Sequence, residues 1–218
     1  MDKRLRDILS QKGFAKSQIL FLEALLRLRQ ICCDPALVND KAPSAKLELL
    51  LDLLQTLVVE KRTVLVFSQF AEMLHRIEAE LRELDISCLK LTGQTKNREE
   101  LIEQFRTGTA PVFLISLKAG GVGLNLTEAD TVIMFDPWWN PAAEQQAVDR
   151  AHRIGQTRQV NVIRLIAENT VEEKILKLQD KKNDIAKQVL AGKQLDTVLN
   201  EEDFLEMLAA GTNQSQDL

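Results

Sequence analysis

Residues 63–68 read Thr63-Val64-Leu65-Val66-Phe67-Ser68, a short apolar run rich in β-branched side chains that predicts a buried strand. From here to residue 166, runs of this kind alternate with amphipathic segments. Strands are expected at 63–68, 86–91, 111–116, 131–135 and 160–166, and helices at 69–84, 97–106 and 141–153. Strand–helix alternation favours a parallel sheet that is covered by helices on both faces. The sequence therefore predicts an α/β fold.

The segments on either side of this alternating region are helical in pattern. Two helices are expected at 17–31 and 44–59, and a third at 170–189, where Thr170 and Glu173 have capping-box spacing. A short helix around Glu201–Leu208 and a polar tail would follow. We thus expect three parts, namely a helical extension over 1–60, the α/β lobe with its C-terminal bracing helix over 61–190, and a short helix with a flexible tail over 191–218.

Composition and charge narrow the class of protein. The 218 residues are 45% hydrophobic and 28% charged, as in soluble globular proteins. A net charge of −4 argues against a globally basic nucleic-acid binder, but it leaves room for a local basic patch. The three cysteines lack zinc-ligand spacing, which favours a reducing compartment and no structural metal. Charged residues interrupt the most apolar stretch, 47–59, so we expect no membrane partner. No secretory signal is visible at the N-terminus, so we expect no secretion and a cytoplasmic or nuclear location.

The run Asp149-Arg150-Ala151-His152-Arg153-Ile154-Gly155-Gln156 is the most informative in the chain. Asn140-Pro141 is an N-cap and first-turn pair, and Gly155 is a helix-ending residue. On such a helix three side chains recur at i, i+4 and i+7 and share a face: Gln146, Arg150 and Arg153. Planar guanidiniums on a rigid element suit a phosphate chain. The alternative is a solvated basic helix end, where arginine also suits the helix dipole.

A glycine-rich loop, Gly120-Gly121-Val122-Gly123, follows the strand expected at 111–116, as phosphate-binding loops do. A dinucleotide-binding crossover is excluded, because about seven residues separate this loop from the strand beginning at Thr131, too few for the crossover helix. The sequence contains no Gly-x-x-x-x-Gly-Lys-Ser/Thr loop and no acidic pair ending a strand. The chain thus has arginines suited to a triphosphate, without the lysine loop or magnesium ligand that would hold one.

Several stretches, taken in order, resemble the SWI/SNF-like branch of the superfamily 2 ATPases, the double-stranded-DNA translocases. They are Leu28-Arg29-Gln30-Ile31-Cys32 with Asp34-Pro35, Val64–Phe70, Leu91-Thr92-Gly93 with Arg98, Ser116–Leu126, Asp136-Pro137-Trp138-Trp139-Asn140-Pro141, and residues 149–156. Together they cover about residues 25–190, and five or more ordered matches are far more specific than one. The ending around Leu195–Leu208 resembles bacterial members more than others.

The resemblance implies a RecA-like lobe, the second of two in the motor. ATP and Mg²⁺ would bind at the interface with the first lobe, which in the family carries the lysine loop and magnesium ligand, and this chain alone would bind neither. Arg150 and Arg153 would be catalytic arginine fingers, with Gly121, Gly123 and Gln146 also beside the nucleotide. The loops at the carboxyl ends of the strands would hold the backbone of double-stranded DNA through Thr92, Gly93, Arg98, Ser116, Lys118, Ala119, Gly120, Asn125 and Trp138.

Two other readings of the chain remain open from the sequence. One is a non-catalytic DNA- or protein-binding module that keeps the lobe fold. The other is a lobe of a helicase that separates strands. For any single loop residue, such as Lys118, an ordinary surface role is the simpler interpretation. As a motor lobe, the isolated chain is expected to be inactive as an ATPase, because half of the site is on another lobe.

Overall fold

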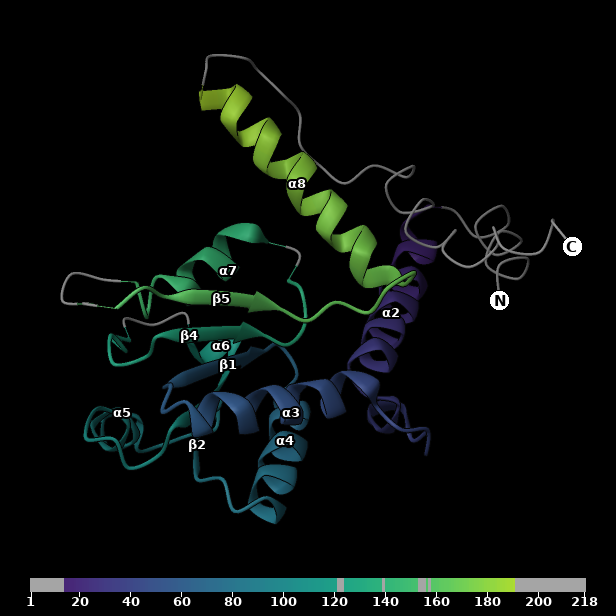
Figure 1. The fold of residues 1–218 in the computed structure, drawn as a ribbon. Coiled ribbons are helices and arrows are strands. Elements are labelled where there is room, and N and C mark those ends of the chain that lie inside the picture. Colours follow the sequence, from purple (N-terminus) through teal and green to yellow (C-terminus); the bar gives the residue numbers. More distant parts are fainter. Residues whose placement is uncertain (1–13, 121–123, 139, 153–155, 157, 191–218) are drawn as a thin grey trace, which may run out of the picture. The chain divides into compact units, whose positions relative to one another are not determined.

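The computed structural model describes residues 14–190 except 121–123, 139, 153–155 and 157 (Figure 1). The chain divides into two compact units. One comprises residues 41–166 and contains the sheet, and the other combines the segments before residue 41 and after residue 166. Within the first of these units, α3 (Ala45–Val59) contacts α4 (Ala71–Glu83).

The sheet has five strands in the order β2-β3-β1-β4-β5, and every neighbouring pair is parallel. The predicted parallel α/β fold is therefore confirmed. At the centre of the sheet, Val64 of β1 is in register with Val112 of β3 on one side and with Thr131 of β4 on the other. The strands are β1 (Val64–Ser68), β2 (Cys88–Leu91), β3 (Val112–Ser116), β4 (Thr131–Met134) and β5 (Asn161–Arg164).

Side chains of the central strands alternate between two cores, as the period of two requires. Leu65 and Phe67 of β1 belong to a cluster that also holds Phe105, Ala119 and Ala147, from the helices α5, α6 and α7. Their neighbours in β1 point to the other face, where α4 contacts the sheet. Figure 1 shows helices on both sides of the strands. The helices of this unit are α3 (Ala45–Val59), α4 (Ala71–Glu83), α5 (Arg98–Arg106), α6 (Leu117–Gly120) and α7 (Pro141–Val148).

Helix α7 begins as predicted and ends earlier than predicted. Asn140 Oδ1 accepts the N–H of Ala142 at 3.1 Å, with Pro141 in the first turn. The α-helix ends at Val148, and the N–H groups of Arg150 and Ala151 donate to carbonyls three residues back, at 3.2 Å to Ala147 and 3.0 Å to Val148. The expected helix over 141–153 is therefore wrong in its last turn. The carbonyl of Arg150 accepts a loop N–H instead, so the chain leaves the helical path.

Two of the three side chains expected on one helical face are described, and they lie in different elements. Gln146 is exposed on α7, whereas Arg150 lies in the following turn and is buried. The third member of the predicted face, Arg153, lies outside the described residues, as does the expected helix end at Gly155.

The second unit consists of α2 (Phe14–Cys33), the short 3-10 helix η1 (Pro35–Val38) and α8 (Val171–Leu190). At the start of α8, Thr170 Oγ1 accepts the N–H of Glu172 at 3.1 Å. The carboxylate that reaches back is that of Glu172, which accepts the N–H of Ala167 at 2.9 Å, one residue before the predicted Glu173. The helix expected around Glu201–Leu208 lies outside the described residues. No helix within the described part of the chain is long and apolar enough to cross a membrane.

Candidate nucleotide and DNA interface

Arg150 is the buried cation of the site. Its side chain is 9% exposed, Nη1 donates to the carbonyl of Leu124 at 3.4 Å, and Nε has no hydrogen-bond partner. No carboxylate pairs with it among the described residues, and the internal positions that the structure leaves undescribed contain no Asp or Glu. A buried guanidinium without a counter-ion is costly. The arrangement therefore suits an anion supplied from outside the chain.

The segment Leu124–Leu126 packs against this arginine. The N–H of Leu126 donates to the carbonyl of Arg150 at 3.0 Å, so the backbones of the two segments are joined directly. Between these contacts lies Asn125, whose Oδ1 is buried without a hydrogen-bond partner, while Arg106 Nη2 donates to its carbonyl at 3.3 Å. The structure thus brings Arg150 together with Asn125, which the resemblance assigns to DNA.

A second group of predicted residues lies at the carboxyl ends of β2 and β3. Thr92 is buried, and its Oγ1 accepts the N–H of Gln94 at 3.3 Å. Ser116 is also buried, and its Oγ accepts the N–H of Ala119 at 3.3 Å. These hydroxyls shape their own loops. Gly93 and Lys118 are exposed at the same edge and are free to meet a ligand from solvent.

Arg98 has an internal partner as well. Its Nη2 donates to the carbonyl of Ala119 at 2.7 Å, which links the start of α5 to the short helix α6. Gly120 is the last residue of α6. Two further predicted residues, Gly121 and Gly123, lie outside the described residues.

Trp138 follows β4 and is half-buried. Its N–H donates to Glu144 Oε1 at 2.8 Å, and Glu144 Oε2 accepts from Arg164 Nε at 3.2 Å. Glu144 is 2% exposed, so a buried carboxylate on the first turn of α7 fixes the turn that carries the tryptophan. Sequence reasoning missed Glu144, although a carboxylate in a first helical turn is a recognisable signal. Trp139 lies outside the described residues.

The carboxylate of Asp136 accepts hydrogen bonds that join two strands of the sheet. It accepts from the hydroxyl of Ser68 and from the N–H of Gln69, so it ties the end of β1 to the end of β4. Within the described residues, no group of three or more His, Cys, Asp or Glu side chains could hold a metal ion.

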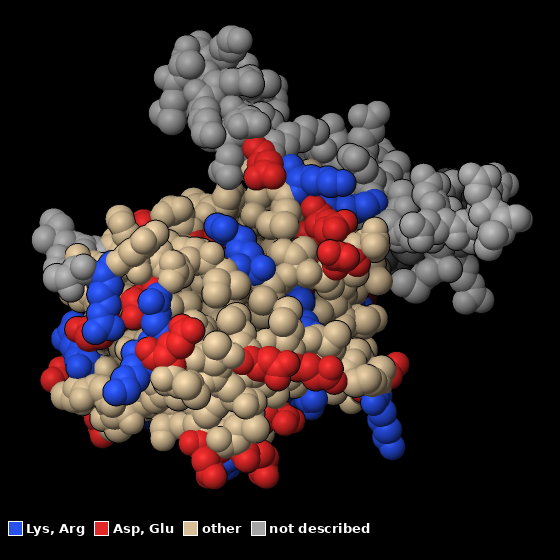
Figure 2. Space-filling model, in the orientation of Figure 1, with Lys and Arg blue, Asp and Glu red and all other residues tan. Residues whose placement is uncertain are grey.

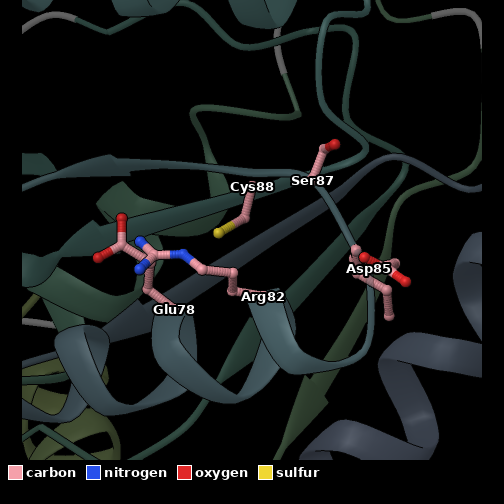
Figure 3. A pocket seen from close by; sticks show the side chains of 6 residues that line it. Glu78, Arg82, Asp85, Ser87 and Cys88 are labelled. Carbon is pink, nitrogen blue, oxygen red and sulfur yellow. The ribbon is translucent and has the colours of Figure 1, made fainter.

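A shallow pocket of about 280 Å³ lies beside edge strand β2 and contains none of the predicted site residues. Figure 3 shows the Arg82 side chain extending towards Glu78, with the Cys88 sulfur beside them. Burial, and secondarily the charge of Glu78, raises the pKa of the Cys88 thiol from 9.0 to about 11.

Charges of both signs are interspersed on the face shown in Figure 2, so this face offers no broad basic surface.

Residues 45–155 match the family described as the helicase conserved C-terminal domain. This stretch is half of the chain, and the chain therefore belongs to that family. The relatives place it in the SWI2/SNF2-like branch. An uncharacterized ATP-dependent helicase of Mycoplasma genitalium is 40% identical over 196 residues, covering 87% of this chain and 19% of the relative. The protein CHROMATIN REMODELING 24 of Arabidopsis thaliana is 41% identical over 169 residues, covering 76% and 16%.

Solved structures agree with this assignment. The SWI2/SNF2 ATPase core of Sulfolobus solfataricus in complex with double-stranded DNA matches with a TM-score of 0.72 and 32% identity. The match covers 88% of this chain and 42% of that one. The C-terminal part of the Fun30 ATPase domain matches with a TM-score of 0.60 and 35% identity, over 82% and 64% of the two chains. The chain spans about a fifth of the length of the curated relatives it matches.

Proposed function

We propose that this chain is the second motor lobe of an ATP-dependent double-stranded-DNA translocase. The observation that carries the proposal is the burial of Arg150. Its Nε has no hydrogen-bond partner, and no carboxylate of the described residues pairs with its guanidinium. In phosphoryl transfer, an arginine stabilises the charge that develops on the transferred phosphoryl group. A buried, preorganised cation does this more strongly than one in water. Arg153 is proposed as the second finger.

The nucleotide would lie between this lobe and a first RecA-like lobe. In this arrangement Arg150 and Arg153 approach the phosphates from one side, with Gly121, Gly123 and Gln146 nearby. Mg²⁺, held by the first lobe and the phosphates, would neutralise phosphate charge. The absence of a lysine loop from the sequence supports this division of the site. Closure of the two lobes around ATP and their reopening after hydrolysis would alternate the grip on DNA.

DNA would be held by its phosphate backbone, so binding would be largely independent of sequence. The exposed residues Gly93 and Lys118 at the carboxyl edge of the sheet are the proposed direct contacts. Thr92, Ser116 and Arg98 would act mainly by fixing those loops, since their polar atoms have internal partners. The double-stranded-DNA complex of the Sulfolobus relative supports this choice of ligand. We propose a bacterial nucleoid or a nucleus as the place of action.

The test is substitution of Arg150 in a full-length protein that carries this chain. Arg150→Ala should lower DNA-stimulated ATP hydrolysis by about 10³-fold or more, while the Kd for duplex DNA changes little. Arg150→Lys should fail as well, because an ammonium group does not reproduce the planar donor fork. Arg158→Ala is the matched control, since this arginine is 64% exposed and pairs with Asp130. Turnover of the Arg150→Ala variant within about tenfold of the wild-type rate would return Arg150 to a structural role.

A further inference from the structure

The side chain of Gln156 makes more hydrogen bonds than any sequence signal suggested. Its Nε2 lies 2.9 Å from the carbonyl oxygen of Thr127, 2.7 Å from that of Ala129 and 3.2 Å from that of Ala151. Its Oε1 accepts the N–H of Arg158 at 2.8 Å. Both amide hydrogens and the amide oxygen are therefore engaged with main-chain groups.

These partners also fix which way the amide points. Three carbonyl oxygens surround one end of the Gln156 side chain, and an N–H group faces the other end. The reversed orientation would place the amide oxygen against three acceptors. The hydrogen-bond network thus determines the assignment of the nitrogen and the oxygen.

The acceptors belong to two different segments. Thr127 and Ala129 precede β4, and Ala151 directly follows Arg150. Ala129 and Ala151 are fully buried, so their neighbourhood is shielded from water. A single side chain thus ties the arginine turn to the segment that continues from Leu124–Leu126.

We propose that Gln156 is the positioning residue for Arg150. Arg150 reaches the segment before β4 through its own side chain and its carbonyl, at Leu124 and Leu126. Gln156 bonds the carbonyl of Ala151 in the same turn, so the backbone that carries the guanidinium is tied to this segment at two neighbouring residues. The inference rests on the proposed function, because positioning matters only if Arg150 meets the nucleotide. Misplacement of a catalytic group by about 1 Å costs on the order of 100-fold in rate.

Another glutamine of the chain provides a matched comparison. Gln145 on α7 is exposed and donates to the exposed carboxylate of Asp149 at 2.9 Å, a local contact four residues away. Gln156 instead bridges positions 27 and 29 residues distant. If glutamines near Arg150 were merely surface residues, substitutions at the two positions would have equal effects.

The experiment uses the full-length protein with three Gln156 variants. Gln156→Met keeps the length without polar atoms, Gln156→Glu keeps the shape but loses both donors, and Gln156→Ala removes the group. Single-turnover hydrolysis with DNA should slow about 10- to 100-fold, with KM for ATP and Kd for DNA nearly unchanged. Gln156→Glu should be at least as slow as Gln156→Met, since a carboxylate would face carbonyl oxygens. Gln145→Met and Gln145→Glu should stay within about twofold of wild type.

A double-mutant cycle with Arg150→Ala separates positioning from a general loss of structure. If Gln156 acts through Arg150, adding Gln156→Met to Arg150→Ala should cause almost no further loss. A full, additive loss in that background, or wild-type kcat in all three Gln156 variants, would overturn the inference while the proposed function stands. Wild-type turnover in Arg150→Ala itself would instead remove the proposed function, and the positioning role would go with it.

Discussion

Asp130 carries the sharpest prediction about stability, because it is a buried carboxylate shared by two arginines of unequal exposure. Its side chain is 2% exposed, whereas those of Arg62 and Arg158 are 29% and 64% exposed. Arg158 Nη1 donates to Oδ2 at 3.2 Å, and Thr131 Oγ1 donates to Oδ1 at 3.0 Å. Arg62 Nε lies 3.0 Å from Oδ1 as an ion pair, although its direction does not meet hydrogen-bond geometry.

The magnitudes follow from which partner keeps access to water. A hydrogen bond to a charged group contributes about 1.5–3 kcal/mol, and an exposed ion pair about 0–1 kcal/mol. Asp130→Ala removes the contacts of both arginines with the carboxylate and the bond from Thr131 Oγ1. Arg158 can turn to solvent and Arg62 keeps the carbonyl of residue 130, so we expect a loss of about 2–3 kcal/mol. Arg62→Ala should lower the free energy of unfolding by about 1–2 kcal/mol. The loss stays below that of Asp130→Ala because the carboxylate of Asp130 keeps Arg158 as a partner. Arg158→Ala should cost under about 1 kcal/mol.

The assay is urea unfolding followed by tryptophan fluorescence. Both tryptophans of the chain, Trp138 and Trp139, belong to the 41–166 unit, so the signal reports unfolding of the unit that contains Asp130. The measured order of the losses in free energy of unfolding should be Asp130, then Arg62, then Arg158. At about 1 M salt the small Arg158 effect should vanish. An Arg158→Ala loss equal to that of Asp130→Ala would refute the reasoning from exposure.

Three further predictions concern function and reactivity. The purified chain should show negligible ATPase activity even with duplex DNA, and robust turnover free of contaminants would contradict the two-lobe site. Lys118→Ala should weaken duplex binding equally for all sequences and reduce the salt slope by about 1; a sequence-dependent effect would count against a phosphate contact. Because the pKa of Cys88 is raised to about 11, its alkylation at pH 8 should be slower in the folded than in the unfolded chain. Because the folded chain favours the neutral Cys88 thiol, this thiol's contribution to the free energy of unfolding is fully present below pH 9. It is lost as pH rises towards 11.

Local signals placed most elements of the fold in advance. Every strand of the sheet lies within its predicted segment, since short β-branched runs bounded by polar turns carry a strong signal. The 3-10 helix η1 and the short helix α6 were not expected, because helices of four residues carry too little periodicity to be recognised. The last turn of α7 was lost because a tertiary bond, from Leu126 N to Arg150 O, outweighed the local preference for helix.

For the candidate site, too, some features follow from the sequence and others only from the tertiary structure. The sequence by itself determined the α/β fold, the family resemblance and the residue types available, because periodicity and ordered motifs are written along the chain. Only the tertiary structure decided that Arg150 is buried beside Leu124, that Glu144 holds the Trp138 turn, and that Gln156 bridges two distant segments. These facts depend on contacts between residues 6 to 29 positions apart. Such contacts form only when the sheet and its helices pack, and no local pattern encodes them.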